Sequence, residues 1–131
     1  MKFPVFDLHC DTATVLCGFG KDDYSDLKNN NAHIDLDRAG KLPGYAQCFA
    51  CFTTYCKNAD PVNIFEKQLT SILRELEKNA DRIQQAFSVQ DIEKNVDAGI
   101  MSAILTIEGP AGFGFDPALL EDLYKIGFRI S

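Results

Sequence analysis

The chain has 131 residues, of which 46% are hydrophobic and 24% are charged, a balance typical of one globular domain that can bury a core. Its formal net charge of -6 argues against a nucleic-acid partner, because phosphates are neutralised by basic surfaces and the sequence has no run of Lys and Arg. No apolar run approaches the roughly 18 residues of a membrane span, and no signal peptide is visible. We therefore expect a cytoplasmic protein without a membrane partner.

The five cysteines form an odd-numbered set, which favours reduced thiols over disulfides. Cys48 and Cys51, followed by Cys56, have the spacing of a thiolate pair in zinc or iron–sulfur sites. A closed site normally needs a second pair, and none follows. Because Cys48 and Cys51 would also face opposite sides of a predicted strand, we interpret these cysteines as core or loop residues.

The first elements in chain order are a short strand and a helical turn. The strand begins at Phe3 and runs into the polar group His9-Cys10-Asp11-Thr12, and the turn ends near Gly18. Residues 20–31 are polar and predict a loop. The segment 33–37 alternates polar and apolar side chains, which predicts a short half-exposed strand, and we interpret its own His-x-Asp spacing as structural.

The rest of the sequence alternates between apolar runs of strand length and segments with one apolar helical face. Proline after an aspartate, at 60–61 and again at 116–117, is typical of a helix start. The predicted elements are a strand at 45–53, helices at 60–83 and 88–99, a strand at 100–107, a helix at 117–127 and a strand that begins at 128.

This alternation predicts an α/β fold of parallel strands with helical crossovers. Since the sequence stops as a strand begins, the edge of that strand would lack its next neighbour. We expect residues 1–131 to be a single partial domain, the N-terminal part of a larger (β/α)8 TIM barrel, which typically needs about 250 residues. A homo-oligomer that covers this edge remains an open alternative.

Polar side chains with metal-binding chemistry follow two of the predicted strands. His9 and Asp11 share one strand face if alternation is regular, and Glu108 ends a later strand. One nitrogen and two oxygen donors suit zinc, and a carboxylate can bridge two metal ions. The alternative for His9 and Asp11 is a hydrogen-bonded pair that closes a strand. Asp7 would lie one layer deeper on the same face, as an acceptor that orients a ligand or as a partner in a strand-end salt bridge. Gln47 must find partners once buried, which we interpret as structural.

Three blocks of sequence, in order, resemble the renal (membrane) dipeptidases and their bacterial relatives. Phe6-Asp7-Leu8-His9-Cys10-Asp11-Thr12 is similar to the family's Asp-x-His-x-Asp opening. His33-Ile34-Asp35-Leu36-Asp37-Arg38, continuing to Gly44-Tyr45-Ala46-Gln47-Cys48-Phe49, is similar to its His-x-Asp-Leu-x-Arg and Gly-x-x-Gln-x-Phe segments. Ile107-Glu108-Gly109, with the helix that leads to Gly127-Phe128-Arg129, is similar to its Ile-Glu-Gly-Gly block and the Leu-Gly-x-Arg that follows. Pro110 stands where the family has glycine, so we expect a different loop after Glu108.

The resemblance implies a TIM barrel with two zinc ions that hydrolyses small dipeptides. His9 and Asp11 would bind one zinc, Glu108 would bridge both, and a bridging hydroxide would attack the peptide carbonyl. In the family pattern the remaining zinc histidines, the substrate-binding histidine and the assisting acid follow Ser131. We therefore expect the 131 residues alone to lack a complete active site and to hold no catalytic residue beyond the metal ligands.

Two other functions stay open at this point. One is a different two-metal amidohydrolase of barrel type, which would act on a cyclic amide or a related bond. The other is a non-catalytic fragment or a module that a partner completes. Metal binding and a substrate panel would separate them.

Overall fold

The computed structural model describes residues 4–18, 25–53 and 60–130. In these residues five strands form one sheet, and every strand pair in it is parallel. The strands are β1 (Val5–Cys10), β2 (Tyr45–Phe52), β3 (Ile83–Gln85), β4 (Met101–Glu108) and β5 (Phe128–Ile130). Their order is β1-β2-β4-β3, and β5 also pairs with β4. The predicted parallel α/β class is confirmed.

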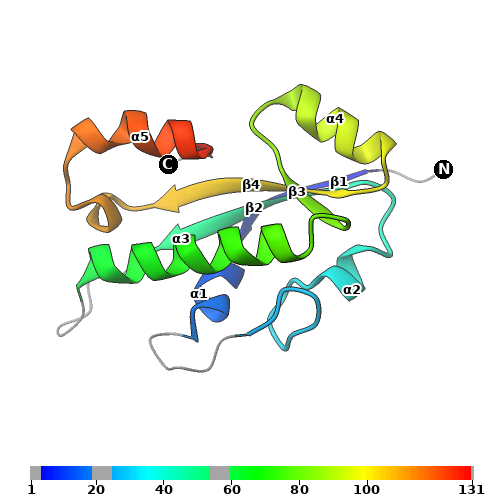
Figure 1. The fold of residues 1–131 in the computed structure, drawn as a ribbon, viewed down its shortest axis with the longest axis horizontal. Coiled ribbons are helices and arrows are strands. Elements are labelled where there is room, and N and C mark those ends of the chain that lie inside the picture. Colours follow the sequence, from blue (N-terminus) through cyan, green and yellow to red (C-terminus); the bar gives the residue numbers. More distant parts are fainter. Residues whose placement is uncertain (1–3, 19–24, 54–59, 131) are drawn as a thin grey trace.

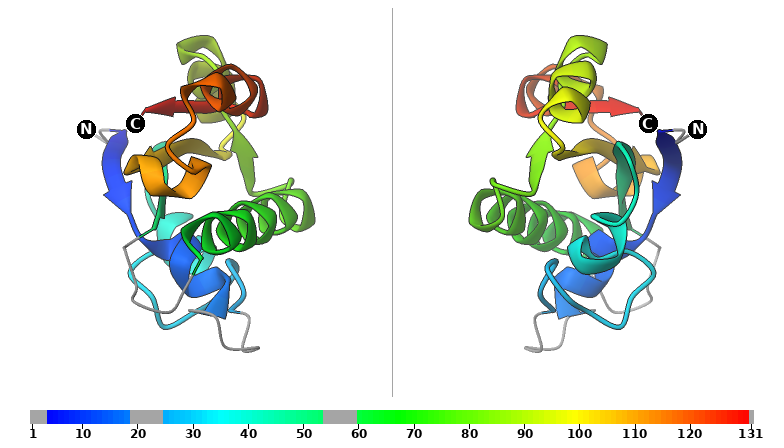
Figure 2. Two further views of the ribbon diagram at one scale, coloured as in Figure 1. Left: turned by 90° about the vertical axis from the view of Figure 1, so that its left-hand side faces the viewer. Right: turned by 90° about the vertical axis from the view of Figure 1, so that its right-hand side faces the viewer.

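Within the described ranges, five helices connect the strands as crossovers or follow them as short turns. They are α1 (Thr12–Leu16), α2 (Leu36–Ala39), α3 (Pro61–Lys78), α4 (Val89–Asp97) and α5 (Leu120–Ile126), with 3-10 turns at Pro110–Phe113 and Pro117–Leu119. Figure 1 shows α1, α2 and α3 below the strands and α4 and α5 above them, and the end views of Figure 2 show the same arrangement. No helix in the described part of the chain is both long enough and apolar enough to cross a membrane.

The main core lies between α3 and one face of the sheet. Phe65 and Ile72 of α3 are buried there, together with alternate residues of the two central strands. The strand residues in this cluster are Tyr45, Phe49, Cys51, Met101, Ala103, Leu105 and Ile107. The other face carries a smaller cluster of Ala46, Cys48, Ala86 and Ile104, against which Ile92 of α4 packs. The apolar runs therefore form strands buried on both faces, as predicted.

The long helix is shorter than predicted, and a strand that was not predicted follows it. α3 ends at Lys78, where Asn79 donates from its backbone and its side chain to the carbonyl of Glu75. Ile83, which fits the helical period, instead lies fully buried in β3. A strand of three residues is too short to show an alternation of its own.

The predicted strand at residues 33–37 is wrong, because the segment enters helix α2. Asp35 is the N-cap of this helix, and its Oδ1 accepts from the Arg38 backbone N–H at 2.8 Å. Its Oδ2 accepts from Arg38 Nε at 2.6 Å. Asp35 is buried while His33 is exposed, so these two residues of the second His-x-Asp motif do not share a site.

Some predictions concern residues outside the described ranges. They are the strand start at Phe3, the loop residues 20–24, Cys56 and the strand residue Ser131. The described part of the predicted loop, residues 25–31, contains neither helix nor strand.

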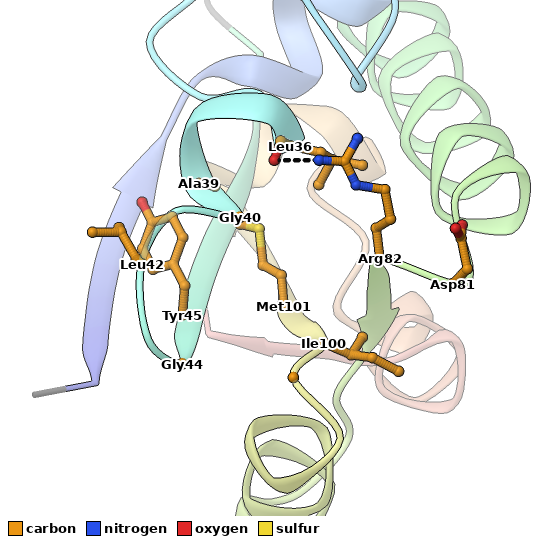
Figure 3. Close-up of a pocket in the computed structure, with 11 residues that line it drawn as sticks. Leu36, Ala39, Gly40, Leu42, Gly44, Tyr45, Asp81, Arg82, Ile100 and Met101 are labelled. Atoms are coloured by element: carbon orange, nitrogen blue, oxygen red, sulfur yellow. Dashed lines mark hydrogen bonds between the residues drawn. The ribbon is translucent and has the colours of Figure 1, made fainter. Parts of the chain in front are cut away.

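A cavity of about 190 Å³ lies at the N-terminal ends of β2 and β4 (Figure 3). Tyr45 and Met101, the first residues of these strands, line it. Arg82 also lines it and donates to the Leu36 carbonyl at 2.7 Å and to Asp37 Oδ1 at 2.8 Å, which ties α2 to the start of β3. The cavity is at the opposite end of the strands from Glu108, so it belongs to the packing of this end of the sheet.

The Asp35 cap predicts a pH-dependent contribution to stability. Burial alone would raise the pKa of Asp35, but its hydrogen bonds to Arg38 outweigh this effect and hold the pKa below the usual 3.8. A carboxylate with a depressed pKa stabilises the folded state above its unfolded pKa, and this stabilisation is lost as the pH falls through the folded value. We expect wild type to exceed Asp35→Asn in free energy of unfolding between pH 5 and 7, with the gap shrinking below about pH 4. Urea unfolding across this range measures it; a gap that widens on acidification would contradict the assignment.

The cysteines predict low thiol reactivity. Cys10, Cys48 and Cys51 are free and buried, and Cys48 and Cys51 belong to clusters on opposite sheet faces, which confirms these two as core residues. Burial raises the pKa of Cys10 to about 11 and that of Cys51 to about 12. Since the thiolate is the reactive form, iodoacetamide at pH 8 should leave both unmodified until denaturant is added. Peptide mapping by mass spectrometry checks this, and rapid labelling of either thiol in the native chain would contradict it.

Candidate metal centre

The sheet register places three predicted ligands at one edge of the molecule. β2 and β4 pair without interruption from Ala46 opposite Ser102 to Phe52 opposite Glu108. β1 pairs with the other side of β2, so all three strands point the same way and end at the same edge. His9 lies near the end of β1, Asp11 directly follows β1, and Glu108 is the last residue of β4.

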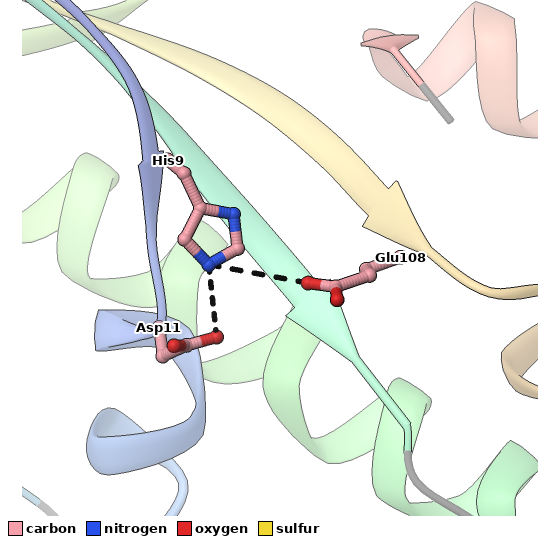
Figure 4. A group of neighbouring side chains, drawn as sticks. All are labelled: His9, Asp11 and Glu108. Atoms are coloured by element: carbon pink, nitrogen blue, oxygen red, sulfur yellow. Dashed lines mark ion pairs between the residues drawn. The ribbon is translucent and has the colours of Figure 1, made fainter.

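The three side chains converge across β2 (Figure 4). Nε2 of His9 lies 3.3 Å from Oδ1 of Asp11 and 3.9 Å from Oε2 of Glu108. One ligand atom from each residue falls within 4.8 Å of the others. The structure therefore brings together the three residues that the sequence predicts as ligands. Among the described residues, no other group of three His, Cys, Asp or Glu side chains is arranged to hold a metal ion.

The Asp11 side chain does not cap the helix that it precedes. It is the N-cap of α1, where an aspartate usually accepts a bond from the helix backbone, yet its side chain makes no capping hydrogen bond. Asp35 at the start of α2 does make one. The Asp11 carboxylate instead approaches His9, and with 60% of its side chain exposed it is open to a ligand.

The site has excess negative charge. Asp11 and Glu108 lie near one imidazole, and neither carboxylate forms an ion pair with Lys or Arg among the described residues. His9 and Glu108 are each 52% exposed, so water and ions can reach the group. One imidazole nitrogen and two carboxylates are donors that zinc accepts, and a divalent cation would balance their charge. The residues present therefore fit a metal ion.

Strand β1 is not regular, and this alters the place of Asp7. Asp7 aligns with Gln47 and Cys10 aligns with Phe49, so two residues of β1 stand opposite the single Cys48 of β2. The regular alternation that would put Asp7 and His9 on one face does not hold. Oδ1 of Asp7 accepts from the His9 backbone N–H at 3.1 Å, and no Lys or Arg ion pair to Asp7 occurs in the described residues.

A hydrogen-bonded group that the sequence did not reveal lies beside Asp7. The Tyr45 hydroxyl contacts Oε1 of Gln47 at 2.6 Å and Oδ2 of Asp7 at 3.4 Å. Gln47 Nε2 donates to the Cys48 carbonyl at 3.0 Å and reaches the Asp7 carbonyl at 3.4 Å. Gln47 is fully buried, and its expected structural role is supported by these partners. Tyr45 and Gln47 lie two residues apart in a strand and so share one face. This spacing is the sequence signal from which their contact could have been predicted.

The loop after Glu108 forms a 3-10 turn that packs on α3. Gly109 has a φ of 88°, in the left-handed region that favours glycine, and Pro110 begins a 3-10 turn. Gly112 in this turn lies so close to Phe65 of α3 that a Cβ there would come within 3.1 Å of the phenylalanine side chain. The turn that starts at Pro110 thus connects Glu108 firmly to the main core.

Comparison with solved structures shows the same fold in several larger enzymes. The dipeptidase AC, a metallopeptidase of family M19, superposes with a TM-score of 0.79 at 19% identity, over 100% of this chain and 44% of that one. A metallopeptidase from Rhodobacter sphaeroides, liganded with a phosphinate mimic of the dipeptide L-Ala-D-Ala, gives 0.77 at 18% identity, over 99% and 45%. An amidohydrolase from Pseudomonas aeruginosa gives 0.60 at 12% identity, over 95% and 31%.

These comparisons also bear on the size and class of the protein. The chain spans less than half the length of each of these three structures. The neighbours of family M19 are dipeptidases of TIM-barrel type, in agreement with the parallel sheet and helical crossovers seen here. No curated protein matches the sequence significantly. The model of the membrane dipeptidases, peptidase family M19, matches residues 1–131 in full, and the chain belongs to this family.

Proposed function

We propose that the chain supplies part of the zinc centre of a metallodipeptidase. The observation that carries the proposal is the convergence of His9, Asp11 and Glu108 at the C-terminal edge of the parallel sheet. In barrel folds this edge is where catalytic groups gather. Membership of a dipeptidase family supports dipeptides as the substrate class.

Each of the three residues has a distinct part in the proposed centre. His9 Nε2 and the Asp11 carboxylate lie together at the end of β1 and would hold one ion. Glu108 faces them from β4 and, with two carboxylate oxygens, could serve that ion and a second one. Zinc, when bound, supplies a Lewis acid for the peptide carbonyl and lowers the pKa of a bound water. The exposure of all three side chains leaves room for a small substrate.

A second candidate is another two-metal amidohydrolase of barrel type. The same ligands would serve it, and an amidohydrolase is among the structural neighbours. The TM-scores favour the dipeptidase, at 0.79 and 0.77 against 0.60. A dipeptide with a D-residue at its C-terminus is a suitable first substrate, since one neighbour binds a mimic of L-Ala-D-Ala.

Zinc binding should depend on His9 and not on His33. We expect the purified chain to bind zinc and His9→Ala to bind it at least about 100-fold more weakly, because loss of a direct ligand costs more than the 10- to 100-fold typical of outer partners. His33→Ala is the matched control, since the other His-x-Asp motif forms a helix cap. Equilibrium dialysis with metal analysis measures both. Equal zinc binding by wild type and His9→Ala would refute the proposed site.

Hydrolysis should be tested on the full-length gene product that contains these residues. We expect it to hydrolyse dipeptides, including L-Ala-D-Ala, and Glu108→Gln to reduce kcat/KM by at least about 100-fold, because a neutral amide is a poor metal ligand. Glu121→Gln, an exposed residue on α5, is the control. Turnover of cyclic amides without turnover of any dipeptide would favour the amidohydrolase instead.

A further inference from the structure

The irregularity in β1 decides which face His9 presents. In a parallel sheet, aligned residues of neighbouring strands point to the same face, so Asp7 shares the face of Gln47 and Cys10 shares that of Phe49. Glu108 aligns with Phe52, three residues after Phe49, and therefore lies on the opposite face. Continued in the register of Asp7, His9 would align with Phe49 and point into the main core. The extra residue in β1 moves it to the face of Glu108, as bulges beside active sites often do.

The bulge creates a backbone group that needs a partner. Two residues of β1, Leu8 and His9, stand opposite one residue of β2, so the regular ladder cannot satisfy both. The His9 N–H donates instead to Oδ1 of Asp7 at 3.1 Å. This bond spans only two residues and closes the chain on itself at the bulge, immediately before the ligand side chain.

The Asp7 carboxylate is itself held from the core side. Its Oδ2 lies 3.4 Å from the hydroxyl of Tyr45, which is buried and bonded to the fully buried Gln47. Burial raises the pKa of Tyr45 to about 12, and the charge of Asp7 adds to the rise, so the hydroxyl keeps its proton as a donor. Asp7 thus connects a fixed polar group in the sheet to the backbone of His9.

We propose that Asp7 is a positioning residue for the metal centre, which holds the bulge of β1 so that the His9 imidazole lies on the same face as Glu108. The inference rests on the proposed function, because it takes His9 and Glu108 as ligands of one site. Asp7 acts through the backbone of His9 and does not touch the ligand atoms. The acceptor oxygen, rather than the charge, is the property that this role requires.

Zinc affinity of the 131-residue chain, measured by isothermal titration with the melting temperature as a folding control, tests the role. We expect Asp7→Ala to bind zinc 10- to 100-fold more weakly than wild type at a similar melting temperature. Asp7→Asn keeps an acceptor oxygen and should stay within about threefold of wild type. Asp26→Ala is the matched control, because Asp26 makes the same kind of bond to the Lys28 N–H, at 2.6 Å, on a segment remote from the site.

The outcomes are separable from those of the proposed function. If wild type binds no zinc, the metal site itself is refuted; if wild type binds zinc and Asp7→Ala binds it equally well, only the positioning role is refuted. Equal weakening by Asp7→Asn and Asp7→Ala would also overturn it, since charge would then be what matters. Should Asp7→Ala fail to fold, amide hydrogen exchange of the wild type decides: the His9 amide should exchange at least tenfold more slowly than an open chain, and an unprotected amide would overturn the role.

Discussion

The parallel register of β1, β2 and β4 is the constraint on which the candidate site depends. Strands that run in the same direction end at one edge, so residues distant in sequence meet there without any contact between their loops. β2 lies between the strands that carry His9 and Glu108, and each strand spacing is about 4.8 Å, so these two side chains must reach across roughly 10 Å of backbone. An imidazole and a glutamate are long enough to close this gap to 3.9 Å.

Asp11 and Glu108 differ from several other acidic residues of the chain in lacking a basic partner among the described residues. Asp26 pairs with Lys78 at 2.6 Å, and Asp37 pairs with Arg82 at 2.8 Å. These ion pairs explain why the pKa of each of the two aspartates lies below its usual value. Asp11 and Glu108 have no such cation among the described residues, although both approach the same imidazole. Two carboxylates that converge without a basic side chain leave negative charge that a cation from solution would balance, which supports the proposed metal centre.

The sequence was sufficient to predict that His9, Asp11 and Glu108 come together, but not the geometry that presents them. His9, Asp11 and Glu108 could be predicted because each follows an apolar run, and the ends of parallel strands meet. Alternation also misled: it predicted a strand where Asp35 caps α2, and it assumed a regular β1, whose bulge depends on pairing with β2. Periodicity extended α3 through Ile83, because it records which side chains are buried and not where the backbone turns. The start of α2, the bulge in β1 and the end of α3 are decided by contacts between segments distant in sequence. A local sequence pattern does not record such contacts.

The two halves of the site are fixed by different forces. Every residue of β4 from Met101 to Ile107 is buried, and the turn after Glu108 packs on Phe65, so hydrophobic packing on both faces sets the position of Glu108. β1 has only Cys10 buried, and its alignment with β2 is interrupted next to His9. Hydrophobic packing therefore contributes little to the position of the His9 imidazole. Hydrogen bonds from polar residues fix that position instead. A hydrogen-bonded group of polar residues therefore lies next to His9, where apolar packing is weak, and not next to Glu108, where it is strong. The group consists of Asp7, Tyr45 and Gln47.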